Sequence, residues 1–227
     1  MIDSTFSCRP ARSANIRYVL RRRRRRRRAR LLVVGAKNRG PLPKPDADAR
    51  LLADLRAAFR WLADRPDRRY AAEPTGWWAD ASILRRLGPA LARPGRESKV
   101  TCVVGPQSRG GLLGALVAVE LGVGLVELRK DPQPATDSDR WITARTPPDY
   151  QDRNLELGLR RDLLPRGSRV LFVDDWIDTG GQAIAARQIV EAAEATWCGA
   201  SVIVDALTDA RLRRDLEVSS IFRDRDL

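Results

Sequence analysis

The sequence predicts an α/β fold in which a parallel sheet carries helices on both faces. Short apolar segments rich in Val, Ile and Leu alternate along the chain with segments whose apolar residues recur every three or four positions. This alternation is typical of strands linked by helices. The chain has 227 residues, of which 43% are hydrophobic, so it is long enough and apolar enough for one domain with a buried core. We expect that domain to span residues 46–227.

The individual elements follow from these patterns. Helices are expected where apolar residues keep helical spacing, at 51–62, 82–91, 112–121 and 180–195. Buried strands are expected at the short apolar segments 99–104, 123–128, 169–173 and 200–204. The Pro-rich segment 131–153 has no apolar periodicity, so a long loop is expected there. Because ligands of parallel sheets bind beyond the carboxyl ends of the strands, functional residues should follow Val104, Leu128 and Val173.

A basic arm precedes the predicted domain. Residues 1–45 carry thirteen Arg and two Lys against one acid, a net charge of +14, whereas residues 46–227 hold 27 basic and 28 acidic residues. The eight consecutive arginines at 21–28 repel one another and cannot form a core, so we expect a disordered arm that ends in a Pro-rich linker. Nucleic acid is therefore an expected partner only through this arm. The other interpretation is a tail without function.

Composition excludes several classes of protein. The chain contains no histidine, which excludes His-based triads and imidazole metal sites. The three cysteines, Cys8, Cys102 and Cys198, match neither a zinc spacing nor a disulfide framework. No apolar run approaches the length of a membrane span, and the N-terminus lacks the pattern of a secretory signal. A cytoplasmic chain without a membrane partner is therefore expected.

The most informative segment runs from residue 170 to residue 182. An apolar strand ends in two adjacent acids, Asp174 and Asp175, and a turn follows where a helix begins. Backbone N–H groups at such a helix start favour an anion such as a phosphate, and glycines permit its close approach. The residues expected to hold the anion are Thr179, Gly180, Gly181 and Gln182. Adjacent carboxylates would repel a phosphate, so they should face sugar hydroxyls or Mg²⁺.

This segment resembles the signature of the type I phosphoribosyltransferases, in which apolar residues lead into two acids and end in Thr-Gly-Gly. The resemblance implies that Asp174 and Asp175 hold the ribose hydroxyls of phosphoribosyl pyrophosphate, directly or with Mg²⁺. It also implies that residues 179–182 hold the 5′-phosphate. The competing interpretation is a surface turn with an acidic cap before a helix.

Two further strand ends support the resemblance. Ser108, Arg109 and Gly110 stand at a strand-to-helix junction, where backbone donors, a hydroxyl and a guanidinium suit a pyrophosphate. This loop resembles the pyrophosphate loop of the adenine phosphoribosyltransferases, which have Ser-Arg-Gly at this place. Arg129 and Lys130 end the strand at 123–128, and the same family has Arg-Lys there. Paired cations fit a leaving group with several negative charges, although solvated charges that open a loop are the other interpretation.

The chain departs from the adenine branch at three places. In that branch the lid loop carries Glu-Tyr-Gly, whereas the nearest stretch here is Tyr-Gln-Asp-Arg at 150–153. Asp178 replaces the usual Ala before Thr-Gly-Gly and is our candidate for proton transfer at the base. In the small hood, residues 76–80 lack the arginine of the Phe-Arg-Asp motif. Trp77 and Trp78 in this stretch belong either to a base-stacking surface or to the core.

Two functions from different classes follow. The first is an enzyme that moves the 5-phosphoribosyl group from phosphoribosyl pyrophosphate to a purine-like base, with Mg²⁺ as cofactor and pyrophosphate as the leaving group, in nucleotide salvage. The second is a non-catalytic sensor of phosphoribosyl pyrophosphate or a nucleotide, which uses the same fold and binds nucleic acid through the arm. The acid pair and both anion loops favour the enzyme. By analogy with the family we expect a homodimer.

Overall fold

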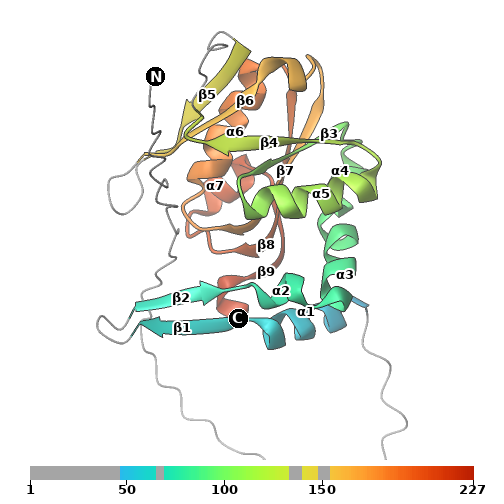
Figure 1. Ribbon diagram of the computed structural model, residues 1–227, viewed down its shortest axis with the longest axis vertical. Coiled ribbons are helices and arrows are strands. Elements are labelled where there is room, and N and C mark those ends of the chain that lie inside the picture. The colour runs from blue at the N-terminus through green and yellow to red at the C-terminus, as the bar shows by residue number, and fades with distance from the viewer. Residues whose placement is uncertain (1–46, 65–68, 133–139, 148–153) are drawn as a thin grey trace, which may run out of the picture.

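The computed structural model describes residues 47–64, 69–132, 140–147 and 154–227, which form a layered α/β domain (Figure 1). Among these residues one sheet has the strand order β5-β6-β4-β3-β7-β8-β9. Its strands are Cys102–Pro106 (β3), Gly124–Lys130 (β4), Trp141–Arg145 (β5), Glu156–Arg160 (β6), Arg169–Ile177 (β7), Thr196–Asp205 (β8) and Val218–Arg223 (β9). The arm predicted at 1–45 lies outside the described residues, so it stays a prediction.

The sheet is mixed rather than wholly parallel. The neighbouring strands β4-β3-β7-β8-β9 are parallel, whereas β6 runs antiparallel to both β4 and β5. The long loop expected at 131–153 was wrong for 141–145, because these residues form β5. The strand alternates buried Ile142 with exposed Thr143. Such an alternation over five residues is too short to stand out between prolines in the sequence.

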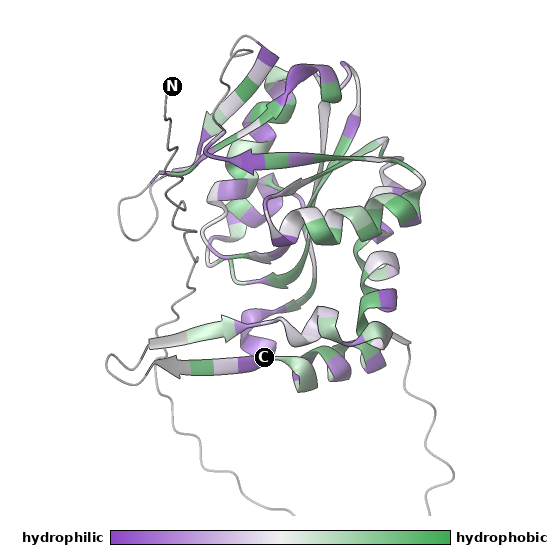
Figure 2. Cartoon of the chain, in the orientation of Figure 1, coloured by the Kyte–Doolittle hydropathy of each residue, from purple (hydrophilic) through white to green (hydrophobic). Residues whose placement is uncertain are grey.

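Helices cover both faces of the sheet, as the sequence predicted. On one face Ile189 of α6 (Gly181–Ala192) packs with Phe172 of β7 in a core cluster. On the other face Leu113 of α5 (Arg109–Leu121) packs with Val173 of β7, together with residues of α1 (Ala47–Ala58) and α3 (Ala81–Leu91). Figure 2 shows hydrophobic residues along the central strands and α5. Within the described residues, no helix has both the length and the apolar character of a membrane span.

The shorter elements connect these layers. They are α2 (Gly76–Ala79), α4 (Arg93–Glu97), α7 (Ala210–Asp215) and single 3₁₀ turns at Arg161–Leu163 and Asp224–Asp226. The predicted helices at 82–91, 112–121 and 180–195 are confirmed as α3, α5 and α6, and the four predicted strands as β3, β4, β7 and β8. None of the short helices had a periodic signal long enough to be recognised in the sequence.

The first predicted helix ends at Ala58 instead of continuing to Leu62. β1 (Arg60–Asp64) begins two residues later and pairs antiparallel with β2 (Arg69–Glu73). With α2, this hairpin forms the hood, which lies below the sheet in Figure 1. The apolar residues that suggested about three turns of helix therefore divide between α1 and the hood.

A cluster of aromatic rings joins the hood to the sheet. The ring of Phe59 stacks on Trp77 at 5.7 Å between centroids and meets Trp61 edge-on at 5.1 Å. Trp61 in turn lies 6.3 Å from Trp176 at the end of β7. Trp77 is fully buried, and its Nε1 donates to the carbonyl of Leu55 at 2.8 Å. Of the two interpretations of Trp77, the structure therefore supports the core residue.

Candidate active site

Three loops meet at one edge of the sheet. They follow β3, β4 and β7, which are adjacent and parallel, so their carboxyl ends point the same way. The contact between the first and third loops is direct: Nη1 of Arg109 lies 2.7 Å from Oδ2 of Asp175. The predicted anion loop at 108–110 and the predicted acid pair are therefore parts of one site.

The two acids at the end of β7 are almost completely buried. Asp174 is 5% exposed and Asp175 is 2% exposed. Oδ1 of Asp174 accepts a hydrogen bond from the N–H of Asp175 at 2.9 Å. Burial raises the pKa of the Asp174 carboxyl well above its ordinary value, and the charge of Asp175 raises it further. A cation placed beside this pair would relieve both effects.

The two cations at the end of β4, Arg129 and Lys130, lie in different surroundings. Successive side chains of a strand point to opposite faces. Lys130 is partly buried near the acids: burial lowers the pKa of its ammonium group, and the charges of Asp174 and Asp175 oppose that shift. Arg129 is exposed instead, with its guanidinium carbon 6.0 Å from the ring centre of Trp141 on β5. Of the two predicted cations, only Lys130 joins the acid pair.

The loop after β3 bends back sharply on itself. A Cβ on Gly105 would lie 2.3 Å from the carbonyl oxygen of Gly110, and one on Gly110 would lie 2.4 Å from Cδ of Pro106, so both positions need glycine. The peptide bond between Gln107 and Ser108 is cis. Ser108 is exposed and its side chain does not cap α5. The hydroxyl of Ser108 and the guanidinium of Arg109 therefore stand at the mouth of the site.

Gln107 is a site residue that sequence reasoning missed. Its N–H donates to the carbonyl of Leu128 at 2.9 Å, and its Oε1 accepts from the N–H of Lys130 at 3.3 Å. Both contacts tie the loop after β3 to the end of β4. The recognisable motif in the sequence is the neighbouring Ser-Arg-Gly. No local pattern indicates that the glutamine before it forms hydrogen bonds with β4.

Residues 178–182, which we call the anion turn, lead from β7 into α6. Gly180 has a φ of 77°, in the left-handed region, and no side chain caps the helix that starts at Gly181. The uncapped N–H groups of a helix start attract anions. Thr179 is exposed, and its hydroxyl accepts a weak hydrogen bond from the N–H of Gly181 at 3.4 Å. Oε1 of Gln182 is buried without a hydrogen-bond partner.

Asp178 lies at the start of the anion turn and differs from its neighbours in environment. Its side chain is half-buried. Burial raises the pKa of its carboxyl, and the negative charge of Asp224 near the C-terminus raises it further. A carboxylate with a raised pKa is a stronger base than an ordinary aspartate, which suits proton transfer near neutral pH.

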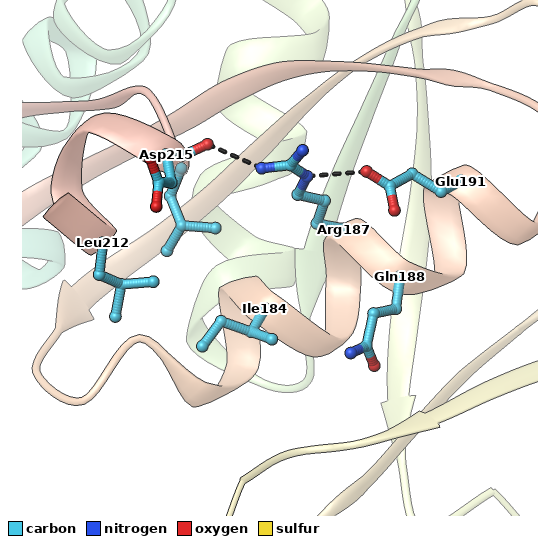
Figure 3. A pocket seen from close by; sticks show the side chains of 7 residues that line it. Ile184, Arg187, Gln188, Glu191, Leu212 and Asp215 are labelled. Carbon is cyan, nitrogen blue, oxygen red and sulfur yellow. Dashed lines mark hydrogen bonds and ion pairs between the residues drawn. The ribbon is translucent and has the colours of Figure 1, made fainter.

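A hollow of about 240 Å³ lies between α6 and α7 (Figure 3). Its lining residues are Ile184, Arg187, Gln188, Glu191, Leu212, Asp215 and Leu216. None of the residues predicted from the sequence for the site lines it. The chemistry suggested by the acids and the anion turn therefore belongs to the sheet edge and not to this hollow.

The sequence is similar to those of known adenine phosphoribosyltransferases. No family model matches it. It is 34% identical over 158 residues to the adenine phosphoribosyltransferase of Maricaulis maris, a match that covers 67% of this chain and 85% of that protein. It is 37% identical over 171 residues to the adenine phosphoribosyltransferase of a Nocardioides species, covering 71% of this chain and 83% of that protein.

Solved structures give the same family. The adenine phosphoribosyltransferase of Rhodothermus marinus matches with a TM-score of 0.65 and 29% identity, over 77% of this chain and 99% of that one. The enzyme of Saccharomyces cerevisiae, solved with an iminoalditol bisphosphate and adenine, matches with a TM-score of 0.62 and 26% identity, over 76% of this chain and 99% of that one. Both similarities cover nearly the whole of the compared enzymes.

Gly180→Ala is expected to destabilise the protein more than Gly167→Ala. Both glycines have a φ of 77°, so each alanine costs about 1–2 kcal/mol for its left-handed backbone. At position 180 the new methyl would also lie 2.8 Å from Cδ2 of Leu212, whereas nothing lies within 4 Å at position 167. Urea unfolding measures the two free energies. Equal losses would contradict the close packing of Leu212 on the anion turn.

Proposed function

This chain belongs to the adenine phosphoribosyltransferases, within the type I phosphoribosyltransferases, and on that premise we propose that it transfers the 5-phosphoribosyl group of phosphoribosyl pyrophosphate to adenine. The products are AMP and pyrophosphate, and the reaction serves purine salvage. The contact between Arg109 and Asp175 carries this proposal, because it unites a pyrophosphate-type loop and a sugar-type acid pair in one site. The alternative, a non-catalytic sensor, is not favoured by these relatives, which are enzymes.

The 5′-phosphate, the pyrophosphate and the ribose hydroxyls of the substrate bind at different loops of the site. The uncapped start of α6 supports binding of the 5′-phosphate by Thr179, Gly180, Gly181 and Gln182. The cationic side chains of Arg109 and Lys130, with Ser108 and the backbone of Gly110, hold the pyrophosphate. Asp174 and Asp175 hold the ribose hydroxyls between them. Arg129 was also expected to bind the pyrophosphate. Its exposed guanidinium lies beside Trp141 and not with the acid pair, and its part in pyrophosphate binding stays a prediction.

Asp174 and Asp175 fit a Mg²⁺ ion that arrives with the substrate. Proteins commonly bind Mg²⁺ through one or two carboxylates together with substrate phosphates, and these neighbouring carboxylates are 5% and 2% exposed. Among the described residues no three or more acids or cysteines gather into a metal cage. The remaining ligands would therefore come from the substrate. When bound, the ion would neutralise charge on the departing pyrophosphate.

The transfer is a substitution at C1 of the ribose. The bond between C1 and a pyrophosphate oxygen breaks, and its electron pair leaves with pyrophosphate. A ring nitrogen of adenine forms the new bond to C1 and gives up its proton, which Asp178 accepts. Positive charge develops on the sugar during this step and negative charge on the leaving group. The acid pair stabilises the first, and Arg109 with Lys130 stabilises the second.

Replacing both acids should stop catalysis without unfolding the protein. In Asp174→Asn/Asp175→Asn, AMP formation from adenine, Mg²⁺ and phosphoribosyl pyrophosphate is expected to fall by about 10³-fold or more, because two charges that act in the transition state are lost. The control Asp54→Asn/Asp215→Asn changes two exposed acids and should leave the rate unchanged. Undiminished AMP formation by the folded acid-pair variant would reject the assignment. A wild-type chain that binds the substrate yet forms no nucleotide would support the sensor.

We propose that two copies of the chain pack through α5. Leu112 and Val119 are 45% and 84% exposed, and Ala115 lies exposed between them on the same helical face. A row of exposed aliphatic side chains on one helix is typical of an interface. Val119→Arg should convert the dimer to a monomer in light scattering, whereas Leu163→Arg, at another exposed leucine, should not. A dimer that survives Val119→Arg contradicts this surface.

We propose further that residues 1–45 bind nucleic acid and that the enzyme works in the cytoplasm. The charge of the arm supports the first part, since the rest of the chain is nearly neutral. Deleting 1–45 should abolish binding to single-stranded RNA. For the full chain, the logarithm of the association constant should fall linearly with the logarithm of salt concentration. AMP formation should remain. RNA affinity that is unchanged by the deletion would exclude the arm as the binding segment.

A further inference from the structure

A buried carboxylate that takes no part in the chemistry above lies one strand away from the acid pair. Asp205 ends β8 and is 2% exposed. β8 runs parallel to β7 with Asp205 opposite Ile177, and the N–H of Ala206 donates to the carbonyl of Ile177 at 2.8 Å. The carboxylate of Asp205 therefore stands beside the point where β7 leads into the anion turn.

Arg213 of α7 and the backbone of Leu207 satisfy this carboxylate. Nε of Arg213 lies 2.5 Å from Oδ2 of Asp205, and Nη2 lies 3.3 Å from Oδ1. Oδ1 also accepts from the N–H of Leu207 at 2.9 Å, while Arg213 donates to the carbonyl of Leu207. The carboxylate of Asp205 and the guanidinium of Arg213 therefore hold the N–H and the carbonyl of Leu207. A second guanidinium, that of Arg223, lies 4.0 Å from Oδ2 of Asp205.

The residues that this ion pair holds in place pack on the anion turn. A Cβ placed on Gly180 would lie 3.4 Å from Cδ2 of Leu207 and 2.8 Å from Cδ2 of Leu212. Leu207 is 5% exposed and belongs to the same core cluster as the residues of α6. The two leucines thus form a roof over Gly180, and the room that they leave admits a glycine in this left-handed conformation.

The far end of α7 is held separately. Nη1 of Arg187 on α6 donates to the carbonyl of Asp215 at 2.8 Å, and Nε of Arg187 pairs with Glu191 (Figure 3). α7 therefore has one attachment to α6 at its carboxyl end and one to β8 through Arg213. Leu212 belongs to α7 and directly precedes Arg213, so these attachments also bear on its place beside Gly180.

We propose that Asp205 and Arg213 are positioning residues for the anion turn, holding Leu207 and Leu212 against Gly180 so that the N–H groups at the start of α6 keep the orientation needed for the 5′-phosphate. This inference rests on the proposed function and assigns a role to residues that do not touch the substrate. Compared with apolar residues of similar volume, a buried ion pair contributes little net stability, because desolvation offsets its attraction, whereas removing one partner leaves a buried charge uncompensated and destabilises the fold. Its effect here is on geometry: weakening the pair loosens the phosphate end of the site and leaves the pyrophosphate end intact.

Isothermal titration with two separate probes tests the proposal. Ribose 5-phosphate carries the 5′-phosphate, and pyrophosphate binds at the opposite end of the site. In Arg213→Met and in Leu212→Ala, the affinity for ribose 5-phosphate is expected to fall about tenfold, whereas that for pyrophosphate should stay within about twofold. Arg213→Lys, which keeps the charge, should recover part of the loss. The control Arg166→Met breaks an exposed pair with Glu194 and should change neither affinity.

A double-mutant cycle measures the roof directly and does not depend on any ligand. Leu212→Ala removes the methyl group that a new side chain at position 180 would meet. The stability lost in Gly180→Ala/Leu212→Ala should therefore be smaller than the sum of the two single losses. Additive losses would show that Leu212 does not press on the turn, and would overturn the proposal even where a variant binds poorly for other reasons.

The outcomes separate this proposal from the proposed function. If the wild-type chain binds both probes and the variants lose both affinities equally, or lose neither, the positioning role is wrong and the enzyme assignment stands. If the wild-type chain binds neither probe, the proposed function fails and the positioning role fails with it. A selective loss for ribose 5-phosphate, together with a non-additive cycle, supports the role of Asp205 and Arg213.

Discussion

The burial of two adjacent carboxylates at the end of one strand is the constraint on which the site depends. An ionised carboxylate loses several kcal/mol of hydration when it is buried, on the order of the penalty that makes unpaired buried charges rare. Asp175 offsets part of this penalty through its ion pair with Arg109, whereas burial raises the pKa of Asp174, whose Oδ1 accepts the N–H of Asp175. Lys130 adds a second cation nearby. The loops after β3 and β4 must therefore lie against the end of β7, and the same charges that stabilise the acids prepare the site for a polyanion.

Close backbone packing makes this convergence of loops possible. Arg109 reaches Asp175 from the first turn of α5 because the chain reverses within five residues of β3, and glycines at 105 and 110 permit that reversal. On the other side of the site, Gly180 permits a similarly close approach, in this case of the side chains of Leu207 and Leu212. Electrostatics thus determines which groups face the substrate, while steric limits at these glycines determine where the groups stand. A side chain at any of the three glycines would move the charges by moving the backbone.

The sequence predicted those parts of the site that depend on residues close together in the chain. The string at 170–182 and the Ser-Arg-Gly at 108–110 each combine a strand end, a turn and a helix start, so local patterns were enough to place them together. What the sequence did not reveal depends on partners far along the chain. Phe59 and Trp61 leave the predicted helix because Trp77 and Trp176 provide rings to pack on. Arg129 and Lys130 separate because β4 continues through them and pairs with β6, and the roles of Gln107 and Asp205 arise from neighbouring strands.

The indole ring of Trp176, which follows the acid pair, connects the hood to the strand that carries Asp174 and Asp175. Trp176 comes directly after Asp175 and is 4% exposed, packed against Phe59 and Trp61 of the hood side. Separating the hood from the sheet would return much of this ring to water, and a tryptophan buries on the order of 200 Å², which corresponds to about 5 kcal/mol. The hood is therefore held in one position relative to Asp175. The large ring of Trp176 is matched by a hood that contributes the aromatic rings of Phe59 and Trp61. The ring contacts of Trp176 therefore fix the hood side of the site relative to Asp175.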